Sequence, residues 1–131
     1  MQVELVSPER ITFSGEATKV LVRTVGGGDI EFLPGHMPFI GVLQVSAAKV
    51  IDGDNAEVFA IHQGFVQMSG DKVTILSDVS ERKEDIDVAR AEASKAAAAT
   101  ALSADAEDLA AKAALRRAEI RLGVASGELP A

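Results

Sequence analysis

The segment Glu81-Arg82-Lys83-Glu84-Asp85-Ile86-Asp87 divides the chain into two parts of opposite composition. Residues 1–84 contain nine of the eleven glycines and five alanines, whereas residues 85–131 contain two glycines and seventeen alanines. Glycine is common in the turns between short strands, and alanine is the strongest helix former. We therefore predict an α+β chain, with a β domain at residues 1–84 and an α-helical domain at residues 85–131.

The bulk composition argues against several classes of function. With 13 basic and 20 acidic residues, the chain has a formal net charge of −7, which disfavours nucleic-acid binding and electrostatic attachment to an anionic membrane. Cysteine is absent from the sequence, so disulfides and thiolate metal sites are excluded. No apolar stretch approaches the ~20 residues of a membrane span, and no secretory signal is expected. We expect a soluble chain without direct membrane insertion.

Short apolar segments recur through the first 84 residues, separated by turn signals. Gly, Asn and Asp dominate these turns because they tolerate the positive φ that tight hairpins require. About nine strands at this spacing predict an antiparallel β-sandwich or flattened barrel. The apolar segments are residues 3–6, 11–13, 20–25, 30–33, 40–45, 50–51, 58–61, 65–68 and 73–76.

The β domain shows no recognisable catalytic pattern. A phosphate-binding loop needs Gly-x4-Gly-Lys-Ser/Thr before a helix, but Asp29 and an apolar segment follow the triple glycine at 26–28, so we interpret it as a loop between strands. His36 and His62 are the only histidines, and a zinc site would need further ligands. We interpret His36, in its proline-flanked loop, as structural, with a contact loop as the alternative. We predict that the chain is not an enzyme and holds no metal.

The alanine-rich part predicts two helices that form an antiparallel hairpin. Asp85 can cap the first helix, and Ser103 or Asp105 can cap the second. Gly123 is placed to end the second helix. Because alanine buries little apolar area, we expect a weakly held arm that opens without melting. The expected contact stripes are Ile86, Ala89, Ala93, Ala96 or Ala97 and Thr100 on the first helix, and Ala111, Leu115, Ala118 and Leu122 on the second.

Three arginines are expected to meet at one level of this hairpin. With a turn near Ser103, Arg90 faces Arg117, and Arg121 lies one helical turn further along the same face. Three guanidinium groups repel unless an anion joins them. Two alternatives stay open: a solvated salt-bridge cluster with Asp87 and Glu119, or a bound phosphate ligand, which arginine holds bidentately.

Three motifs in order resemble the ε subunit of the F-type ATP synthase, named δ in mitochondria, over essentially the whole chain. The first is Gly28-Asp29-Ile30-Glu31-Phe32-Leu33-Pro34-Gly35-His36-Met37-Pro38-Phe39. The second joins Gly64-Phe65-Val66-Gln67-Met68 to Val73-Thr74-Ile75-Leu76-Ser77-Asp78. The third is Ala114-Leu115-Arg116-Arg117-Ala118-Glu119-Ile120-Arg121-Leu122.

The resemblance implies a non-catalytic subunit of the central stalk, peripheral on the cytoplasmic face of the bacterial plasma membrane. It implies a sandwich of about ten strands that binds the γ subunit and the c-subunit ring, followed by a hairpin of two helices that extends toward the α and β subunits and inhibits ATP hydrolysis. Candidate stalk or ring contacts are Gly28, Asp29, His36, Met37 and Pro38.

In some bacterial members of this family the folded arm holds ATP as a regulatory ligand. By similarity, the candidate residues here are Glu81, Ile86, Asp87, Arg90, Ala91, Arg117 and Arg121. The sequence departs from the pattern at residues 96–99, where a run of alanines stands in place of a further arginine. No cofactor is expected to be required.

Two rival interpretations belong to other classes of protein. One is an unrelated small enzyme or ligand-binding sandwich with a helical tail, which predicts clustered acids or histidines. The other is a free-standing small nucleotide-binding regulatory protein that uses only the arginine cluster.

Overall fold

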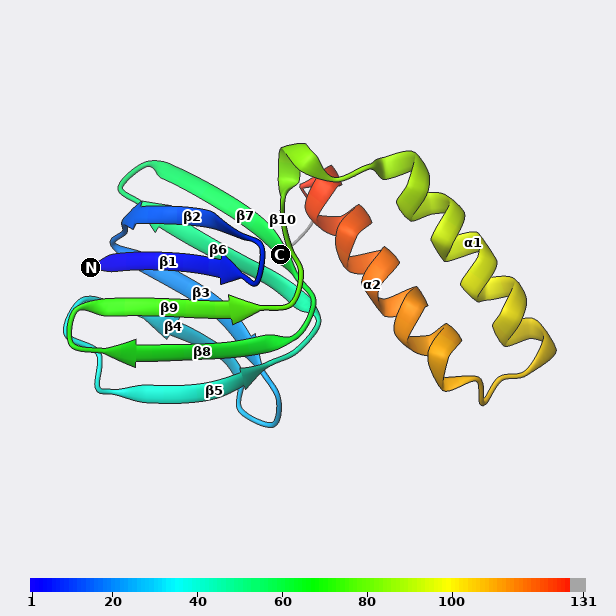
Figure 1. Cartoon of the computed structure of the whole chain (residues 1–131), viewed down its shortest axis with the longest axis horizontal. Helices are drawn as coiled ribbons and strands as arrows, with labels where there is room; N and C mark the ends of the chain where they lie inside the picture. Colours follow the sequence, from blue (N-terminus) through cyan, green and yellow to red (C-terminus); the bar gives the residue numbers. More distant parts are fainter. Residues whose placement is uncertain (128–131) are drawn as a thin grey trace.

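Ten strands followed by two helices make up residues 1–127, the part of the chain that the computed structural model describes (Figure 1). The predicted sandwich of about ten strands followed by a helical part is confirmed. The strands are β1 (Gln2–Ser7), β2 (Arg10–Glu16), β3 (Lys19–Thr24), β4 (Gly28–Phe32), β5 (Phe39–Leu43), β6 (Ser46–Asp52), β7 (Asn55–Ile61), β8 (Gly64–Ser69), β9 (Lys72–Ser77) and β10 (Ser80–Arg82).

The strands form two layers that join along both edges. One layer runs β4-β3-β6-β7-β10 and the other β5-β8-β9-β1-β2, and a single residue pair, Thr24 with Leu43, connects them between β3 and β5. At the other edge, the hydroxyls of Thr12 and Ser80 lie 2.7 Å apart, and Arg82 donates to the carbonyl of Thr12 at 2.8 Å. The sandwich is therefore nearly closed. Neighbouring strands are antiparallel except β1 and β9, which are parallel.

The main hydrophobic core lies between the two layers. Side chains alternate between the faces of each strand, so every second residue points inward. The fully buried members come from both layers, and Phe32 and Phe59 are the largest of them. The core includes Val3, Leu5, Val20, Val22, Phe32, Leu43, Val50, Phe59, Ile61, Val66, Met68, Val73 and Ile75.

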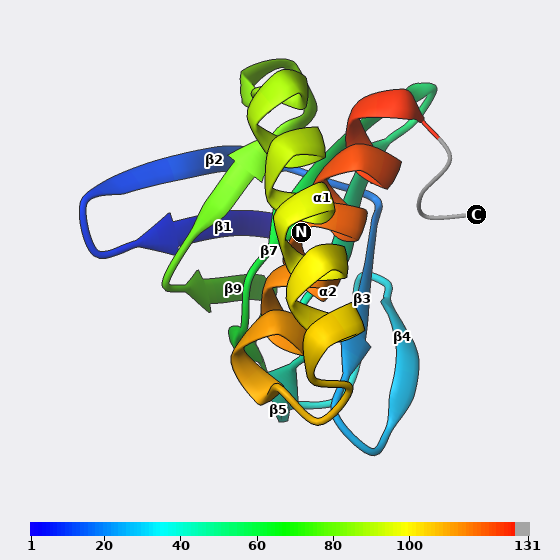
Figure 2. The same ribbon diagram turned by 90° about the vertical axis from the view of Figure 1, so that its right-hand side faces the viewer.

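The helical hairpin packs against one end of the sandwich. After a 3-10 turn at Lys83–Asp85, α1 (Val88–Ala104) and α2 (Leu109–Ser126) run antiparallel, with α2 on β6 and β7 and α1 on the outer side of α2 (Figures 1 and 2). The contact forms a small hydrophobic cluster, separate from the main core, of Ala60, Ile86, Ile120 and Val124. Neither of these helices is apolar over the length that crossing a membrane requires.

The caps of α1 and α2 differ from those predicted. Asp85 belongs to the 3-10 turn, and Asp87 caps α1 by accepting a bond of 3.1 Å from the backbone N–H of Arg90. Asp108 caps α2 by accepting a bond of 3.0 Å from the N–H of Ala111. Several acidic residues near each helix start can act as caps, and the sequence does not show which has extended backbone.

The predicted start and end of the second helix were also wrong. Ser103 lies inside α1, and Asp105 accepts a bond of 3.0 Å from the N–H of Glu107 within the connecting turn. Gly123 is buried inside α2, and Gly127, with φ of 82°, ends it in a left-handed conformation. The left-handed backbone that ends the helix therefore lies four residues beyond the predicted position.

The contact stripe predicted for α1 lies on the wrong face of the helix. Ala91 and Ala98 are the buried residues of α1, whereas Ala89 and Ala93 are exposed. Alanine surrounds the helix on nearly all sides, so the pattern has no apolar periodicity from which to read the inner face. On α2, leucine and isoleucine give the sequence an apolar periodicity, and the predicted contact residues Ala111 and Ala118 are buried.

Gly64 cannot be replaced by any other residue without displacing the backbone. Its φ is 147°, and an added Cβ would lie 1.9 Å from the carbonyl oxygen of Leu76 on the paired strand. This close approach of β8 and β9 lies two residues from His62, at the end of the sandwich that faces α2.

We predict that Gly64→Ala destabilises the isolated protein by about 3 kcal/mol or more, because the clash is with backbone. Gly70→Ala is the matched control: its φ is also positive, at 63°, but nothing lies within 4 Å of an added Cβ. That change should cost only about 1 kcal/mol. Urea denaturation measures both, and equal losses would contradict the role given to the contact.

Candidate functional site

Glu81 connects the sandwich to the arm. It lies on β10 opposite Ala60, and this strand face is the one that α2 covers. One carboxylate oxygen, Oε1, accepts a hydrogen bond of 2.9 Å from His62 Nε2 and one of 2.6 Å from Arg121 Nε. Within residues 1–127, the bond to Arg121 is the only side-chain hydrogen bond that joins α2 to the sandwich.

The environment of Glu81 keeps it ionised. The hydrogen bond from His62 is the largest cause, burial opposes it, and the hydrogen bond and charge of Arg121 add to it. Together they lower the pKa of Glu81 from 4.5 to about 2. The carboxylate is therefore a fixed negative charge beneath the arm at all ordinary pH values.

His62 is buried directly behind this carboxylate. It follows β7, is 6% exposed, and donates its backbone N–H to the carbonyl of Val79 at 3.1 Å. Its other ring nitrogen, Nδ1, is buried and has no hydrogen-bond partner in the described part of the chain. His62 thus holds Glu81 from the sandwich side while Arg121 holds it from the arm side.

Three of the predicted ATP-site residues support the arm itself. Ile86 is 8% exposed and belongs to the cluster between α2 and the sandwich. Asp87 caps α1, and Ala91 is buried between the helices. Glu81 and Arg121 are in direct contact, as described above.

Arg90 and Arg117 lie on the same side of the hairpin as Arg121. Successive residues on a helix are 100° apart. On α1, this spacing places Arg90 on one side of the contact between α1 and α2, and Glu92 and Lys95 on the other side. The same spacing on α2 places Arg117 and Arg121 opposite Glu119. No ion pair formed by residues 1–127 involves Arg90 or Arg117.

The register of the three arginines differs from the prediction. The turn lies between Ala104 and Leu109 rather than near Ser103, which moves every facing pair of residues along the hairpin. Arg90 therefore lies nearer the level of Arg121 than that of Arg117. The cause is that the turn comes later in the chain than predicted, because each further residue moves a helix along its axis and so changes which residues face one another.

The salt-bridge alternative named the wrong acids. Asp87 is used as a helix cap, and Glu119 lines a groove on the opposite side of the hairpin. Glu81, which comes from the sandwich, is the acid that pairs with an arginine of the arm. Sequence spacing within a hairpin cannot identify a partner supplied by another domain.

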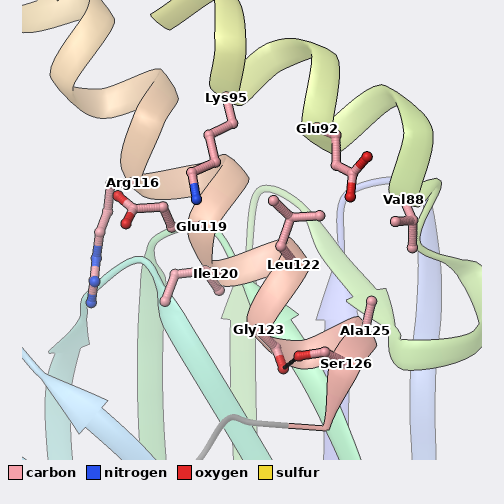
Figure 3. A pocket seen from close by; sticks show the side chains of 10 residues that line it. All are labelled: Val88, Glu92, Lys95, Arg116, Glu119, Ile120, Leu122, Gly123, Ala125 and Ser126. Atoms are coloured by element: carbon pink, nitrogen blue, oxygen red, sulfur yellow. Dashed lines mark hydrogen bonds between the residues drawn. The ribbon is translucent and has the colours of Figure 1, made fainter. Parts of the chain in front are cut away.

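The groove that Glu119 lines runs between α1 and α2 and has a volume of about 760 Å³ (Figure 3). Its charged residues are Glu92 and Lys95 from α1 and Arg116 and Glu119 from α2. None of the seven candidate ATP-site residues lines it. A second groove of about 630 Å³ separates Arg117 from the end of the sandwich, with Phe65 and Asp78 on its far wall.

The two candidate contact loops are separated by the length of β4. Gly28, with φ of 71°, and Asp29 begin the strand, and Asp29 forms an ion pair of 2.7 Å with Arg23. The hydrogen bond from Arg23 lowers the pKa of Asp29. The triple glycine is a loop between strands, as interpreted.

The second loop is built around His36. Its Nδ1 lies 2.7 Å from the carbonyl of Met37, and its ring meets that of Phe32 edge-on with centroids 4.9 Å apart. The histidine thus packs onto the core. Met37 is 76% exposed, and Pro38 beside it is exposed as well. The loop combines a structural histidine with an accessible apolar side chain.

A row of apolar side chains, all exposed except the half-buried Val6, crosses the outer face of one sheet layer. Strand pairing places Val42, Phe65, Leu76, Val6 and Ile11 side by side across β5, β8, β9, β1 and β2. Phe65 is 55% exposed and Ile11 62%. Outer faces of sandwiches are usually polar, and an apolar row of this kind is typical of an interaction surface.

Residues 1–83 match the family model described as ATP synthase, Delta/Epsilon chain, beta-sandwich domain. The chain belongs to this family. The ATP synthase epsilon chain of Streptomyces coelicolor is 39% identical over 128 residues, which are 97% of this chain and 96% of that protein. The similarity to epsilon chains thus continues through the helices, beyond the residues that the family model covers.

Two solved structures contain chains of the same fold. One, of Euglena gracilis mitochondrial ATP synthase with OSCP, F1 and c-ring, has a chain that superposes with a TM-score of 0.78 at 21% identity, over 95% of this chain and 79% of that one. The other, of the central stalk and c-ring of Tetrahymena thermophila mitochondrial ATP synthase, gives 0.58 at 11% identity, over 97% and 94%. At these identities the likeness shows a shared fold.

Sequence reasoning missed two features of this delta/epsilon-family chain. It gave His62 no role, and no local signal connects that residue to Glu81. The sequence does give a partial signal for the apolar row. In segments such as residues 39–43 and 73–76, apolar residues stand at adjacent positions. Because adjacent strand residues point to opposite faces, such a strand is apolar on both of them. Only strand pairing shows that these extra residues align.

We predict that Glu81 stabilises this epsilon-family fold in a pH-dependent manner. Because its pKa is lower in the folded protein, the contribution is fully present above pH 4.5 and is lost as the pH falls through about 2. Allowing for solvent screening of the partly exposed ion pair, we expect about 2 kcal/mol at pH 7.

The measurement is urea denaturation of the native protein and of Glu81→Gln, which keeps the shape and removes the charge. The difference between the two should be about 2 kcal/mol at pH 7 and should shrink toward zero at pH 2. A difference that does not change between these pH values would show that charge is not its source.

Proposed function

We propose that this chain is a non-catalytic subunit of the central stalk of an F-type ATP synthase, peripheral on the cytoplasmic face of the bacterial plasma membrane. Membership of the delta/epsilon family and similarity to an epsilon chain over nearly the full length support this proposal. The shared fold with chains of ATP synthase structures that include the c-ring is consistent with it.

The apolar row on the outer sheet layer is the observation that carries the docking role. Val42, Phe65 and Leu76 are aligned on adjacent strands of a rigid, nearly closed sandwich, and nothing in residues 1–127 covers them. The γ subunit is the proposed occupant. An apolar strip on a firmly packed scaffold suits a rotating partner, because torque passes through the contact only if the scaffold does not deform.

The c-ring is the second proposed partner, and one of the two loops at the ends of β4 would contact it. Asp29 is already neutralised by Arg23 in one loop, whereas Met37 presents an uncovered apolar side chain in the other. The candidates therefore offer different chemistry, a charged pair at one end and an apolar contact at the other.

The helical arm is proposed to regulate ATP hydrolysis by leaving the sandwich and extending toward the α and β subunits. Its hold on the sandwich is small: the cluster around Ile120 and Val124, and the bond from Arg121 to Glu81. α1 and α2 pack on one another through alanines and have their own caps, so the hairpin can detach without either helix melting.

ATP is proposed as a regulatory ligand that stabilises the folded arm. Arg90, Arg117 and Arg121 lie on one side of the hairpin, and Arg90 and Arg117 have no acid partner within the described residues. A ligand at ~100 times its dissociation constant that binds only the folded state favours that state by ~2.7 kcal/mol. This is enough to shift an equilibrium that rests on so small a cluster.

We predict that Phe65→Glu weakens binding to the γ subunit by about 2 kcal/mol, roughly thirtyfold, since it places a charge at the centre of an apolar contact. Leu109→Glu is the control, because Leu109 is an exposed apolar residue at the far end of the arm. Binding to purified γ is measured by surface plasmon resonance. Unchanged binding by Phe65→Glu would reject the row as the docking surface, and a native protein that ignores γ would favour the free-standing nucleotide-binding regulator.

We predict that the isolated protein binds ATP and that Arg90→Ala weakens this binding by about tenfold or more, through loss of a bidentate phosphate contact. Lys95→Ala is the matched control, because it removes a cation from the opposite side of α1. Isothermal titration calorimetry with ATP reports both. An absence of heat from the native protein at millimolar ATP, or an equal loss in the control, would end the proposal for this site.

A further inference from the structure

The bond between Glu81 and Arg121 shares its acceptor atom with a histidine. His62 Nε2 and Arg121 Nε both bind Oε1 of Glu81, at 2.9 and 2.6 Å, so the two nitrogens lie no more than about 5.5 Å apart. One group belongs to the sandwich and the other to the arm. Any change in the charge of His62 therefore acts directly on the one side-chain hydrogen bond that, within residues 1–127, holds α2 to the sandwich.

The position of the first ring proton on His62 follows from its partner. A carboxylate can only accept, so Nε2 must donate to Glu81 and carry a hydrogen. A second proton can then be added only at Nδ1, which leaves the bond to Glu81 intact. Nδ1 is buried without a partner among residues 1–127, so a proton added there would make an N–H with no acceptor.

The other two members of the cluster do not titrate near neutral pH. Glu81 remains ionised down to a pKa of about 2, and arginine is always charged in proteins. Histidine is the side-chain type that ordinarily changes charge between pH 5 and 8. A pH response of this contact over that range therefore has one source.

The charges around the cluster do not replace either partner. Arg82, the next residue on β10, is turned to the other side of the strand, where it binds Glu57 and the carbonyl of Thr12. Within residues 1–127, none of the other charged groups on the segments packed against His62 and Glu81 forms an ion pair with the cluster; they include Arg10 of β2, Lys49 of β6, Asp78 before β10, Lys83, Glu84 and Asp85 of the 3-10 turn, and Lys112, Arg116, Arg117 and Glu119 of α2.

We propose that His62 positions Glu81 for Arg121 and that protonation of His62 releases the arm. Protonation would place a positive ring within about 5.5 Å of the Arg121 guanidinium, and the repulsion between the two cations weakens the hold of Glu81 on the arm. Once α2 has left β7, that repulsion is gone and water can reach the ring. Acid thus favours the released arm, and neutral or alkaline pH favours the docked arm. This inference rests on the proposed function, since it requires an arm that moves.

Fluorescence energy transfer in the full chain tests the proposal. The sequence has no cysteine, so dyes can be placed at Asp54→Cys in the exposed turn between β6 and β7 and at Ala97→Cys on the outside of α1. For the native chain we expect the ratio of docked to released arm to fall on the order of tenfold between pH 8 and pH 5.5.

Two histidine variants form the matched pair. His62→Gln keeps an N–H donor for Glu81 but cannot gain a charge, so the ratio should become independent of pH over this range. His36→Gln removes the other histidine, which lies at the far end of β4, and should leave the pH response unchanged. A response that survives in His62→Gln, or that disappears in His36→Gln, overturns the assignment.

A second measurement does not depend on the folding of His62→Gln. Coupling between two sites is reciprocal, so removing Arg121 must make His62 easier to protonate. The NMR titration curve of the His62 ring should lie at higher pH in Arg121→Gln than in the native chain. Coincident curves would reject the coupling.

Glu81→Gln separates failure of this inference from failure of the proposed function. If Glu81→Gln releases the arm but the native ratio does not respond to pH, the arm moves and only the role of His62 is wrong. If the arm stays docked in both Glu81→Gln and Arg121→Gln, the movable arm fails, and this inference fails with it.

Discussion

Small side chains on the outer face of β6 and β7 determine how the two parts of this molecule meet. Ala47 and Ala60 form a cross-strand pair there, and they leave room for Ile120 and Val124 of α2 to approach the sheet. Such a contact is close but buries little apolar area. The arm is consequently well placed and weakly held, and it depends on a charged contact at its margin more than a larger interface would.

The sandwich is held together in a different manner from the arm. Its two layers enclose a continuous core that includes Phe32 and Phe59, and side-chain hydrogen bonds between Thr12, Ser80 and Arg82 close one edge. Rearranging this core would expose large apolar side chains, at a cost of several kcal/mol. The molecule therefore combines a firmly packed scaffold with a weakly held arm, and it is the position of this arm that we propose a ligand or a proton shifts.

The sequence predicted the strands well and the helices less well, for a physical reason. Each of the nine apolar segments corresponds to a strand, because turns rich in Gly and Asp interrupt the chain clearly. The nine predicted segments do not include β10, because Ser80, Glu81 and Arg82 are all polar. This strand is stabilised by pairing with β7. In α1, alanine on every side concealed the buried face at Ala91 and Ala98, and Asp87 rather than Asp85 proved to be the cap.

The sequence by itself determined the division into a β and a helical part, the alanine-rich composition of the hairpin and the arginines of α2, since these depend on composition and short-range spacing. Only the tertiary structure decided that Glu81 binds Arg121, that buried His62 lies behind it, and that Val42, Phe65 and Leu76 align into one surface. These arrangements join residues from 11 to 40 positions apart. Contacts over such separations are set by strand pairing and by docking of the arm, which no local pattern encodes.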